Sequence, residues 1–297
     1  MLINASNLDL IFKGFNTAFN KGLSEAPSRY RDVAMVVPSE TGETEYGWLG
    51  ETPAIREWLG DRHINSLMAS SYTIKNRRFE STVAVQRTQI EDDKYGVMSP
   101  VYQKMGRDAA LFPDSLVFAL LSAGFHEPCY DGQPFFDAEH RVIAENGADT
   151  LASNFQDGEG EPWFLLDCSQ PIKPLIYQER IPFEFQHVDK PSDPHVFFRD
   201  EYVYGTRGRG NAGFGLWQLG FGSKAELNAV NYEAARAAMQ NRRGDNGKRL
   251  GITATHLVVS PTLEGKARSL LVATHLANGA TNVWSGSAEM IMTPYLG

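Results

Sequence analysis

The sequence has little of several features that mark common protein classes. Two cysteines, Cys129 and Cys168, stand among 297 residues, so a disulfide framework is not the stabilising device. No uninterrupted apolar run approaches the roughly 18 residues of a membrane span. The opening segment MLINASNLDLIFKGF interrupts its apolar positions with Asn, Asp and Lys, which excludes a secretory signal. We therefore expect a cytoplasmic protein without membrane contact.

The chain also lacks an excess of basic side chains. Its 28 Lys and Arg residues stand against 36 Asp and Glu residues, which gives a net charge of −8. A field of this sign repels nucleic acid on average. Repressors, nucleases and polymerase accessories draw much of their affinity from a basic face, so these classes are excluded. The wall of a container, whose contents must not adhere strongly, stays compatible with this charge.

A cofactor loop is not supported either. Gly208, Gly210 and Gly213 match the pattern G-x-G-x-x-G, but the residues FGLWQLGFG that follow alternate like a strand. A dinucleotide site needs a helix N-terminus at that point to receive the pyrophosphate. We interpret the stretch as a mobile loop that carries Arg207 and Arg209 toward carboxylates of a partner.

Metal and nucleophile motifs are weak. His126, Cys129, Asp137 and His140 lie close in sequence but lack the regular spacing of a zinc site, and turn chemistry explains their polarity. The chain has no G-x-S-x-G elbow. We predict no catalytic residue, no cofactor and no metal. An enzyme with a Gly-rich cofactor loop is the remote alternative.

Helical and extended patterns are both present, and the 42% hydrophobic fraction is that of a folded globular protein. Residues 1–30 read as an amphipathic helical arm that ends at Gly22 and Pro27. Its apolar positions are Leu8, Ile11, Phe12, Phe15 and Phe19. This segment is either an ordinary core helix or an arm that docks on a neighbouring subunit.

Residues 33–87 contain short extended runs around a charged segment with Trp48 and Trp58. A long excursion of this kind fits poorly inside a compact domain. Two interpretations stay open. The segment is a small antiparallel sheet with a covering helix, or it is a projecting hairpin whose apolar side is completed by another chain.

The strongest helix is predicted over residues 99–123, with Ser99 as N-cap and Pro100 at the first position. Pro113 should kink or restart it. Strands are expected at WFLLD, PLIYQER and VFFRDEYVYG, a helix over 229–242, a strand at THLVVS and a helix at PTLEGKARSLLV. This mixture indicates an α+β chain with a mixed layer.

The order of several unusual strings resembles one family. YGWLG, REWLG, Met105-Gly106-Arg107, PCYDGQPFFDAEH, LLDCSQPIKPLIYQER, GFGLWQ and LGITATHLVVSP follow one another as in the major head subunits of Mu-like phages, called gpT. The resemblance runs from the arm to the terminal MTPYL. It implies the Hong Kong phage (HK-ninety-seven) capsid fold, with an N-terminal arm, an extended hairpin called the E-loop, a peripheral domain on a spine helix, and an axial α/β domain.

On this plan the chain divides into five parts. They are the N-terminal arm 1–33, the E-loop with flanking peripheral strands 34–95, the peripheral domain with its spine helix 96–170, the axial domain 171–282, and a C-terminal strand 283–297 that returns to the peripheral sheet.

The resemblance also implies a function. The chain would be a major capsid protein that assembles into an icosahedral shell around double-stranded phage DNA, without catalysis. Its partners would be other copies in hexamers and pentamers, a separate scaffolding protein, a portal, a decoration protein, and DNA held by weak non-specific contact. It would reside in the virion, and in the host cytoplasm before assembly. An encapsulin-like compartment is the alternative.

Assembly contacts are expected from apolar side chains on the arm and hairpin, and from arginines that pair with acidic groups of a neighbouring copy. The residues predicted for these contacts are Phe12, Phe15, Trp48, Trp58, Arg56, Arg77, Arg78, Arg207 and Arg209.

Overall fold

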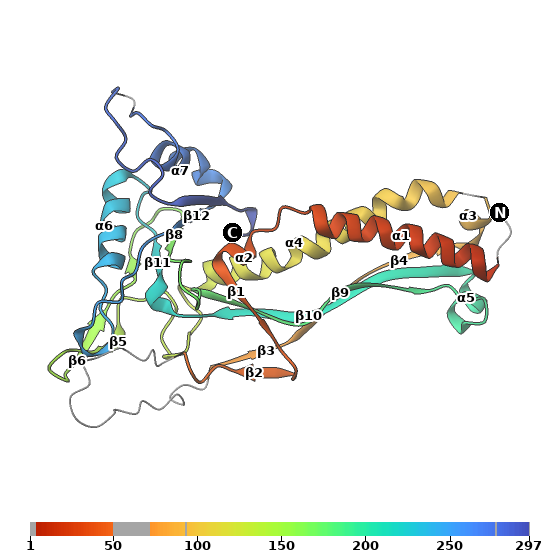
Figure 1. The fold of residues 1–297 in the computed structure, drawn as a ribbon, viewed down its shortest axis with the longest axis horizontal. Helices are drawn as coiled ribbons and strands as arrows, with labels where there is room; N and C mark the ends of the chain where they lie inside the picture. The colour runs from red at the N-terminus through yellow and green to blue at the C-terminus, as the bar shows by residue number, and fades with distance from the viewer. Residues whose placement is uncertain (1–3, 50–71, 93, 277, 297) are drawn as a thin grey trace.

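A computed structural model describes residues 4–49, 72–92, 94–276 and 278–296 (Figure 1). The molecule is elongated. Two long helices and a four-stranded sheet form one end, and a five-stranded sheet with two shorter helices forms the other. No helix within the described ranges is both long enough and apolar enough to cross a membrane.

The predicted arm helix is α1, Ala5–Glu25, and the predicted spine helix is α4, Ser99–Ala123. The Asn4 side chain caps α1 by accepting a hydrogen bond from the backbone N–H of Asn7 at 2.8 Å. α4 continues through Pro113, so the predicted restart is wrong. Pro113 is buried, and we attribute the continuity to packing, which outweighs one missing backbone donor.

The two helices pack closely because each has a glycine that faces the backbone of the other helix. A Cβ atom at Gly22 would lie 1.9 Å from the carbonyl oxygen of Gln103, and one at Gly106 would lie 1.9 Å from that of Phe19. Such distances leave no room for any side chain. The arm therefore packs on the spine helix of its own chain.

The four-stranded sheet has the order β1-β9-β10-β4. Its strands are β1 Ala34–Pro38, β9 Leu175–Val188, β10 Glu201–Phe214 and β4 Arg77–Gln86. β9 and β10 form a long antiparallel hairpin, and β1 joins β9 in parallel. The chain between β9 and β10 contains a short helix, α5, Pro194–Arg199, at the end of the molecule where α1 begins (Figure 1).

The Gly-rich stretch predicted as a mobile loop lies within β10, so that prediction is wrong. The glycines make room for neighbouring side chains and backbone. A Cβ at Gly208 would lie 2.9 Å from the ring of Phe183, and one at Gly213 would lie 2.2 Å from the side chain of Ile74. A 3-10 turn, Trp217–Leu219, follows β10, and no α-helix is available there to receive a pyrophosphate.

The five-stranded sheet has the order β13-β12-β8-β11-β7. Its strands are β13 Glu289–Met292, β12 His256–Val259, β8 Trp163–Leu166, β11 Gly220–Ser223 and β7 Phe155–Gln156. All four residues of β8 are buried, since one face of the sheet packs toward α4 and the other toward α6, Ala229–Gln240, and α7, Glu264–Leu271.

Strand pairing groups three segments differently from the division expected from the sequence. β8, predicted with the spine helix in 96–170, is the central strand of the five-stranded sheet. β9 and β10, predicted within the axial part 171–282, form the sheet that α1 and α4 cover. The C-terminal strand β13 pairs in parallel with β12 and does not return to the sheet beside the spine helix. Local patterns do not specify these non-local pairings.

Smaller elements complete the fold. β2, Glu43–Glu45, pairs antiparallel with β3, Thr73–Lys75, and both interpretations of residues 33–87 allow this pairing. β5, His140–Ile143, pairs with β6, Asp149–Ala152. The short helix α2, Tyr30–Val33, connects the arm to β1. A second short helix, α3, Arg87–Glu91, follows β4 and leads toward α4.

Candidate assembly surfaces

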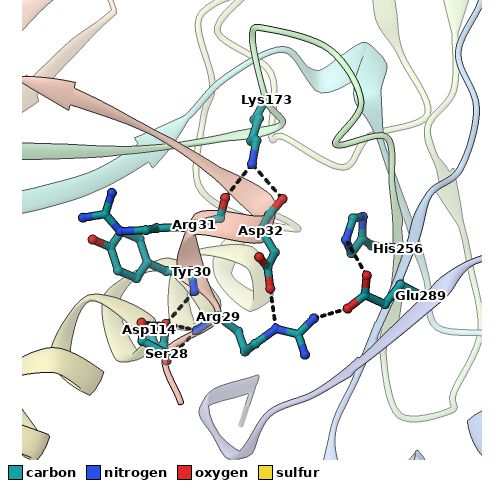
Figure 2. Close-up of polar contacts among 9 residues, drawn as sticks. All are labelled: Ser28, Arg29, Tyr30, Arg31, Asp32, Asp114, Lys173, His256 and Glu289. Atoms are coloured by element: carbon teal, nitrogen blue, oxygen red, sulfur yellow. Dashed lines mark hydrogen bonds and ion pairs between the residues drawn. The ribbon is translucent and has the colours of Figure 1, made fainter. Parts of the chain in front are cut away.

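A polar junction holds the arm, the spine helix and the five-stranded sheet together (Figure 2). Asp114 of α4 accepts hydrogen bonds from the Ser28 hydroxyl at 3.0 Å and from the backbone N–H groups of Arg29 and Tyr30 at 3.1 and 2.6 Å. The two backbone groups lie at the start of α2, where N–H groups have no acceptor within the helix. Burial raises the pKa of the Asp114 carboxyl, and the three hydrogen bonds oppose that shift.

The Arg29 side chain extends the junction to the second sheet. Its guanidinium contacts the carboxylates of both Asp32 and Glu289. Glu289 lies on β13 and also faces His256 of β12 at 3.7 Å. Lys173, which precedes β9, donates to the carbonyl of Asp32 at 3.0 Å (Figure 2). The junction therefore links the segment before β1 and β9 with β12 and β13 of the second sheet.

The junction should make stability depend on pH through His256. Burial lowers the pKa of His256 below its ordinary 6.5, with Glu289 opposing. The unfolded chain then binds this proton more readily, so stability is lost as the pH falls below 6.5. We expect the unfolding temperature of the protein to decrease as the pH is lowered from about 7.5 to about 5.5. The decrease should be smaller in His256→Gln. An equal drop in both proteins would contradict this role.

The arm residues predicted to dock on a neighbour are largely covered by their own chain. The Phe15 side chain is 2% exposed, and its ring centroid lies 4.1 Å from that of Tyr102 and 5.1 Å from that of Tyr204. Phe12 is half-buried, 3.8 Å from the His187 ring. The prediction that Phe15 lacks burial within its own subunit is wrong, because the α1–α4 contact draws this face of the arm inward.

Of the contact residues predicted on the hairpin, the structure describes Trp48 but not Arg56 or Trp58. Trp48 is half-buried, and its ring meets that of Tyr46 edge-on at 6.1 Å. The Tyr46 hydroxyl donates to Gln178 at 2.8 Å, which fastens this part of the hairpin to β9. Trp58 and Arg56 lie outside the described residues, so their contacts stay predictions.

The predicted arginines lie on β4 and β10. Alternation places Arg207 and Arg209 on the face opposite the buried Thr206, away from α1 and α4. Arg78 is the cross-strand partner of Arg209 and shares that face. Arg77 has the opposite orientation, with its guanidinium 5.3 Å from the Phe79 ring centroid.

We call the part of this side that carries Arg78, Arg207 and Arg209 the outer sheet face. Farther along β10, β3 covers the same side, since Ile74 packs with Ile176 of β9. The outer sheet face mixes charges of both signs, because Arg207 is the register partner of Glu80 on β4 and of Glu184 on β9. A face of this composition suits a polar contact. The structure thus brings Arg78, Arg207 and Arg209 together, whereas their contact with another copy stays a prediction.

An exposed aromatic pair was missed from the sequence. Phe197 and Phe198 of α5 are 76% and 81% exposed, and their ring centroids are 5.3 Å apart. The string VFFRDEYVYG was predicted as one strand, but its first half is helical and β10 begins at Glu201. Asp193 and Pro194 ahead of it are a helix-start signal that could have separated the two elements.

Two of the four sequence-adjacent metal candidates do come together. The Cys129 thiol donates to Asp131 at 3.1 Å, and His140 Nδ1 lies 2.7 Å from the other Asp131 oxygen. Burial raises the pKa of the Cys129 thiol, and Asp131 adds to the shift. Among the described residues, His126 and Asp137 are not part of this group. These hydrogen bonds account for the group as a brace of the turn, and the absence of a metal stays a prediction.

Comparison with known proteins shows which family has this sequence and architecture. The family model described as Mu-like prophage major head subunit gpT matches residues 8–296 of this chain. The chain is 40% identical to the major capsid protein of Escherichia phage Mu, over the full length of both chains. It is 43% identical to the Mu-like prophage FluMu major head subunit of Haemophilus influenzae, over 88% of this chain and 87% of that one.

Solved structures agree with the sequence relatives. A chain of the bacteriophage JBD30 procapsid superposes with a TM-score of 0.88 at 45% identity, covering 99% of this chain and all of that one. A chain of the JBD30 capsid gives 0.78 at 36% identity, with full coverage of both chains. The predicted HK-ninety-seven-type fold is confirmed, as is a structural rather than catalytic protein. The chain belongs to the Mu-like prophage major head subunit gpT family.

Proposed function

We propose that this chain is the major subunit of an icosahedral phage head and that it acts by self-assembly without catalysis. The observation that carries the proposal is the match to the head subunit family over residues 8–296, on a fold shared with the JBD30 procapsid chain. The relatives are phage and prophage head subunits, so the encapsulin-like alternative is not retained.

The shape of the molecule supports this function. An elongated body with the charged outer sheet face and an exposed aromatic pair offers several separate contacts. Each is modest by itself, but closure of a shell makes many of them at once, which renders the assembly hard to reverse.

We assign the parts of the capsid plan as follows. The peripheral domain comprises α1, α4 and the four-stranded sheet, the axial domain comprises the five-stranded sheet with α6 and α7, and the E-loop is the excursion based on β2 and β3. This assignment follows the strand pairing and replaces the sequence-based boundaries.

The partners follow from the same reasoning. We propose hexamers and pentamers of this chain, a separate scaffolding protein and a portal. A decoration protein is included because the related JBD30 capsid is described as decorated with minor capsid protein trimers. Packaged double-stranded DNA would be held weakly, given the net charge of −8. The subunit would occupy the host cytoplasm before assembly and the virion afterwards.

Electron microscopy of the purified chain, expressed alone and together with the other head proteins of its phage, tests the function. Capsomers, tubes or closed shells are expected. A compact monomer that persists at high concentration under both conditions would contradict the proposal.

The E-loop assignment can be tested by replacement. Deleting residues 45–85 would remove β3 and most of β4, and β4 pairs with β10 along its ten residues. Replacing only residues 50–71 with a Gly-Ser segment of equal length spares every described strand. We expect a folded subunit with a normal unfolding midpoint that forms no shells. Normal particles from this variant would refute the assignment.

A further inference from the structure

A hollow of about 270 Å³ lies between α1 and the start of α4. Its walls include Leu10, Ile11 and Phe15 on the arm and Ser99 on the spine helix. The exposed side chains of Leu10, Val97 and Val101 belong to the same two segments. The hollow is therefore lined mainly by apolar side chains, with Asn7 and Ser99 as its polar lining residues.

Gly14 forms part of this hollow and has no evident role in the subunit's own packing. Glycine is among the least favourable residues inside a helix. Gly22 and Gly106 are explained by backbone contacts at 1.9 Å, but a Cβ at Gly14 would meet nothing within 4 Å among the described residues. The missing side chain at position 14 keeps the hollow open. We call this site the Gly14 hollow.

The aromatic pair of α5 has the opposite character, because it projects. Val196 is buried in the cluster that also contains Phe15 and Tyr204, so α5 is anchored to the body of the protein. Asp200, with φ of 53°, ends the helix, and Phe197 and Phe198 stay exposed. α5 and the first half of α1 lie at the same end of the elongated molecule (Figure 1).

We propose that Phe197 and Phe198 of one copy dock in the Gly14 hollow of a neighbouring copy. The proposal rests on the proposed shell function and names one of its contacts. A one-turn helix seated in a hollow of this size buries far less than the roughly 800 Å² per partner of a stable pair. Such a contact holds only where many others act with it, which is the situation within a shell and points to a second copy as the occupant.

The two surfaces also determine the type of contact. The projecting pair and the hollow are different surfaces, so the contact is heterologous, and a heterologous contact forms a ring when its rotation closes. Because both surfaces lie at one end of the molecule, copies would meet end to end around such a ring.

Disulfide trapping tests the contact. Two variants, Leu10→Cys and Phe198→Cys, each in a Cys168→Ser background that leaves only the buried Cys129, are mixed, assembled and oxidised. We expect mixed disulfide-linked dimers. The matched control combines Leu10→Cys with Val283→Cys, which is 78% exposed but lies next to Trp284 of the α6 and α7 cluster. Particles without mixed dimers, or equal yields from both combinations, would overturn the inference. Failure of the wild-type chain to form particles would instead overturn the proposed function.

Filling the hollow gives an independent readout. Gly14→Leu places a good helix former at a position with free space, so the unfolding midpoint of the subunit should rise. Particle yield should fall by about tenfold or more, because the lost contact is repeated at every copy of the shell. Gly14→Ala should raise the midpoint with a smaller loss of yield. A Gly14→Leu subunit that is more stable and still assembles normally would overturn the inference.

Discussion

Replacing Gly106 by alanine is expected to cause the largest loss of stability among the variants considered, about 3 kcal/mol or more. The new Cβ atom would lie 1.9 Å from the carbonyl oxygen of Phe19 and 2.8 Å from its carbonyl carbon. Both are backbone atoms of a helix and cannot move aside, so α1 must separate from α4. Overpacking a core costs about 1–3 kcal/mol where side chains can adjust. Here we expect the upper end, about 3 kcal/mol or more, in urea-induced unfolding.

The control for this variant is in the same pair of helices. Gly14→Ala meets nothing within 4 Å among the described residues and should stabilise the subunit by about 0.5–1 kcal/mol. Gly22→Ala, whose Cβ would lie 1.9 Å from the carbonyl of Gln103, should behave like Gly106→Ala. If Gly106→Ala unfolds at the wild-type urea concentration, the close crossing of α1 and α4 is wrong.

Replacing Asp114 by alanine should have the next largest effect. The carboxylate accepts hydrogen bonds from the Ser28 hydroxyl and from the backbone N–H groups of Arg29 and Tyr30, and it is 4% exposed. Its removal leaves buried donors at the start of α2 without an acceptor, at a cost of about 1–3 kcal/mol each. We expect a total loss of about 3 kcal/mol, measured by thermal or urea-induced unfolding.

Asp108 provides the matched control on the same helix. Its carboxylate is 57% exposed and pairs with Lys104 one turn away, an interaction that water screens. Asp108→Ala should therefore change stability by less than about 0.5 kcal/mol. Asp114→Asn keeps an acceptor oxygen and should lie between the two alanine variants. Equal effects of Asp114→Ala and Asp108→Ala would show that the junction does not hold the arm.

The elements with strong local signals could be predicted from the sequence. Ser99 and Pro100 mark the start of a helix, and α4 spans Ser99–Ala123, the predicted range. The predicted cap is wrong by one residue, because Met98 is the N-cap and Ser99 is the first helical residue. The apolar spacing of residues 1–30 predicted α1, and the continuous run THLVVS predicted β12. The signals of these elements lie within a few residues of chain, where helix caps and periodicity act.

The candidate contacts were harder to predict, because exposure is not a local property. Phe15 and Phe198 are both aromatic residues in helices. Phe15 is buried against Tyr102, whereas Phe198 is exposed to solvent. Likewise, Gly14 and Gly22 occupy the same helix, but only Gly22 faces a neighbouring backbone. Sequence alone cannot separate the members of these pairs, since the difference comes from which remote segment packs against each.

The sequence by itself determined the family, the mixed helix and strand content, and the positions of the main helices, because ordered motifs and short-range periodicity specify them. The tertiary structure alone decided which strands share a sheet, that the arm packs on its own spine helix, and which side chains stay available to other copies. Those outcomes depend on pairings between segments far apart in the chain, such as Gly106 with Phe19 and β8 with β12, whose energies arise only once the backbones meet.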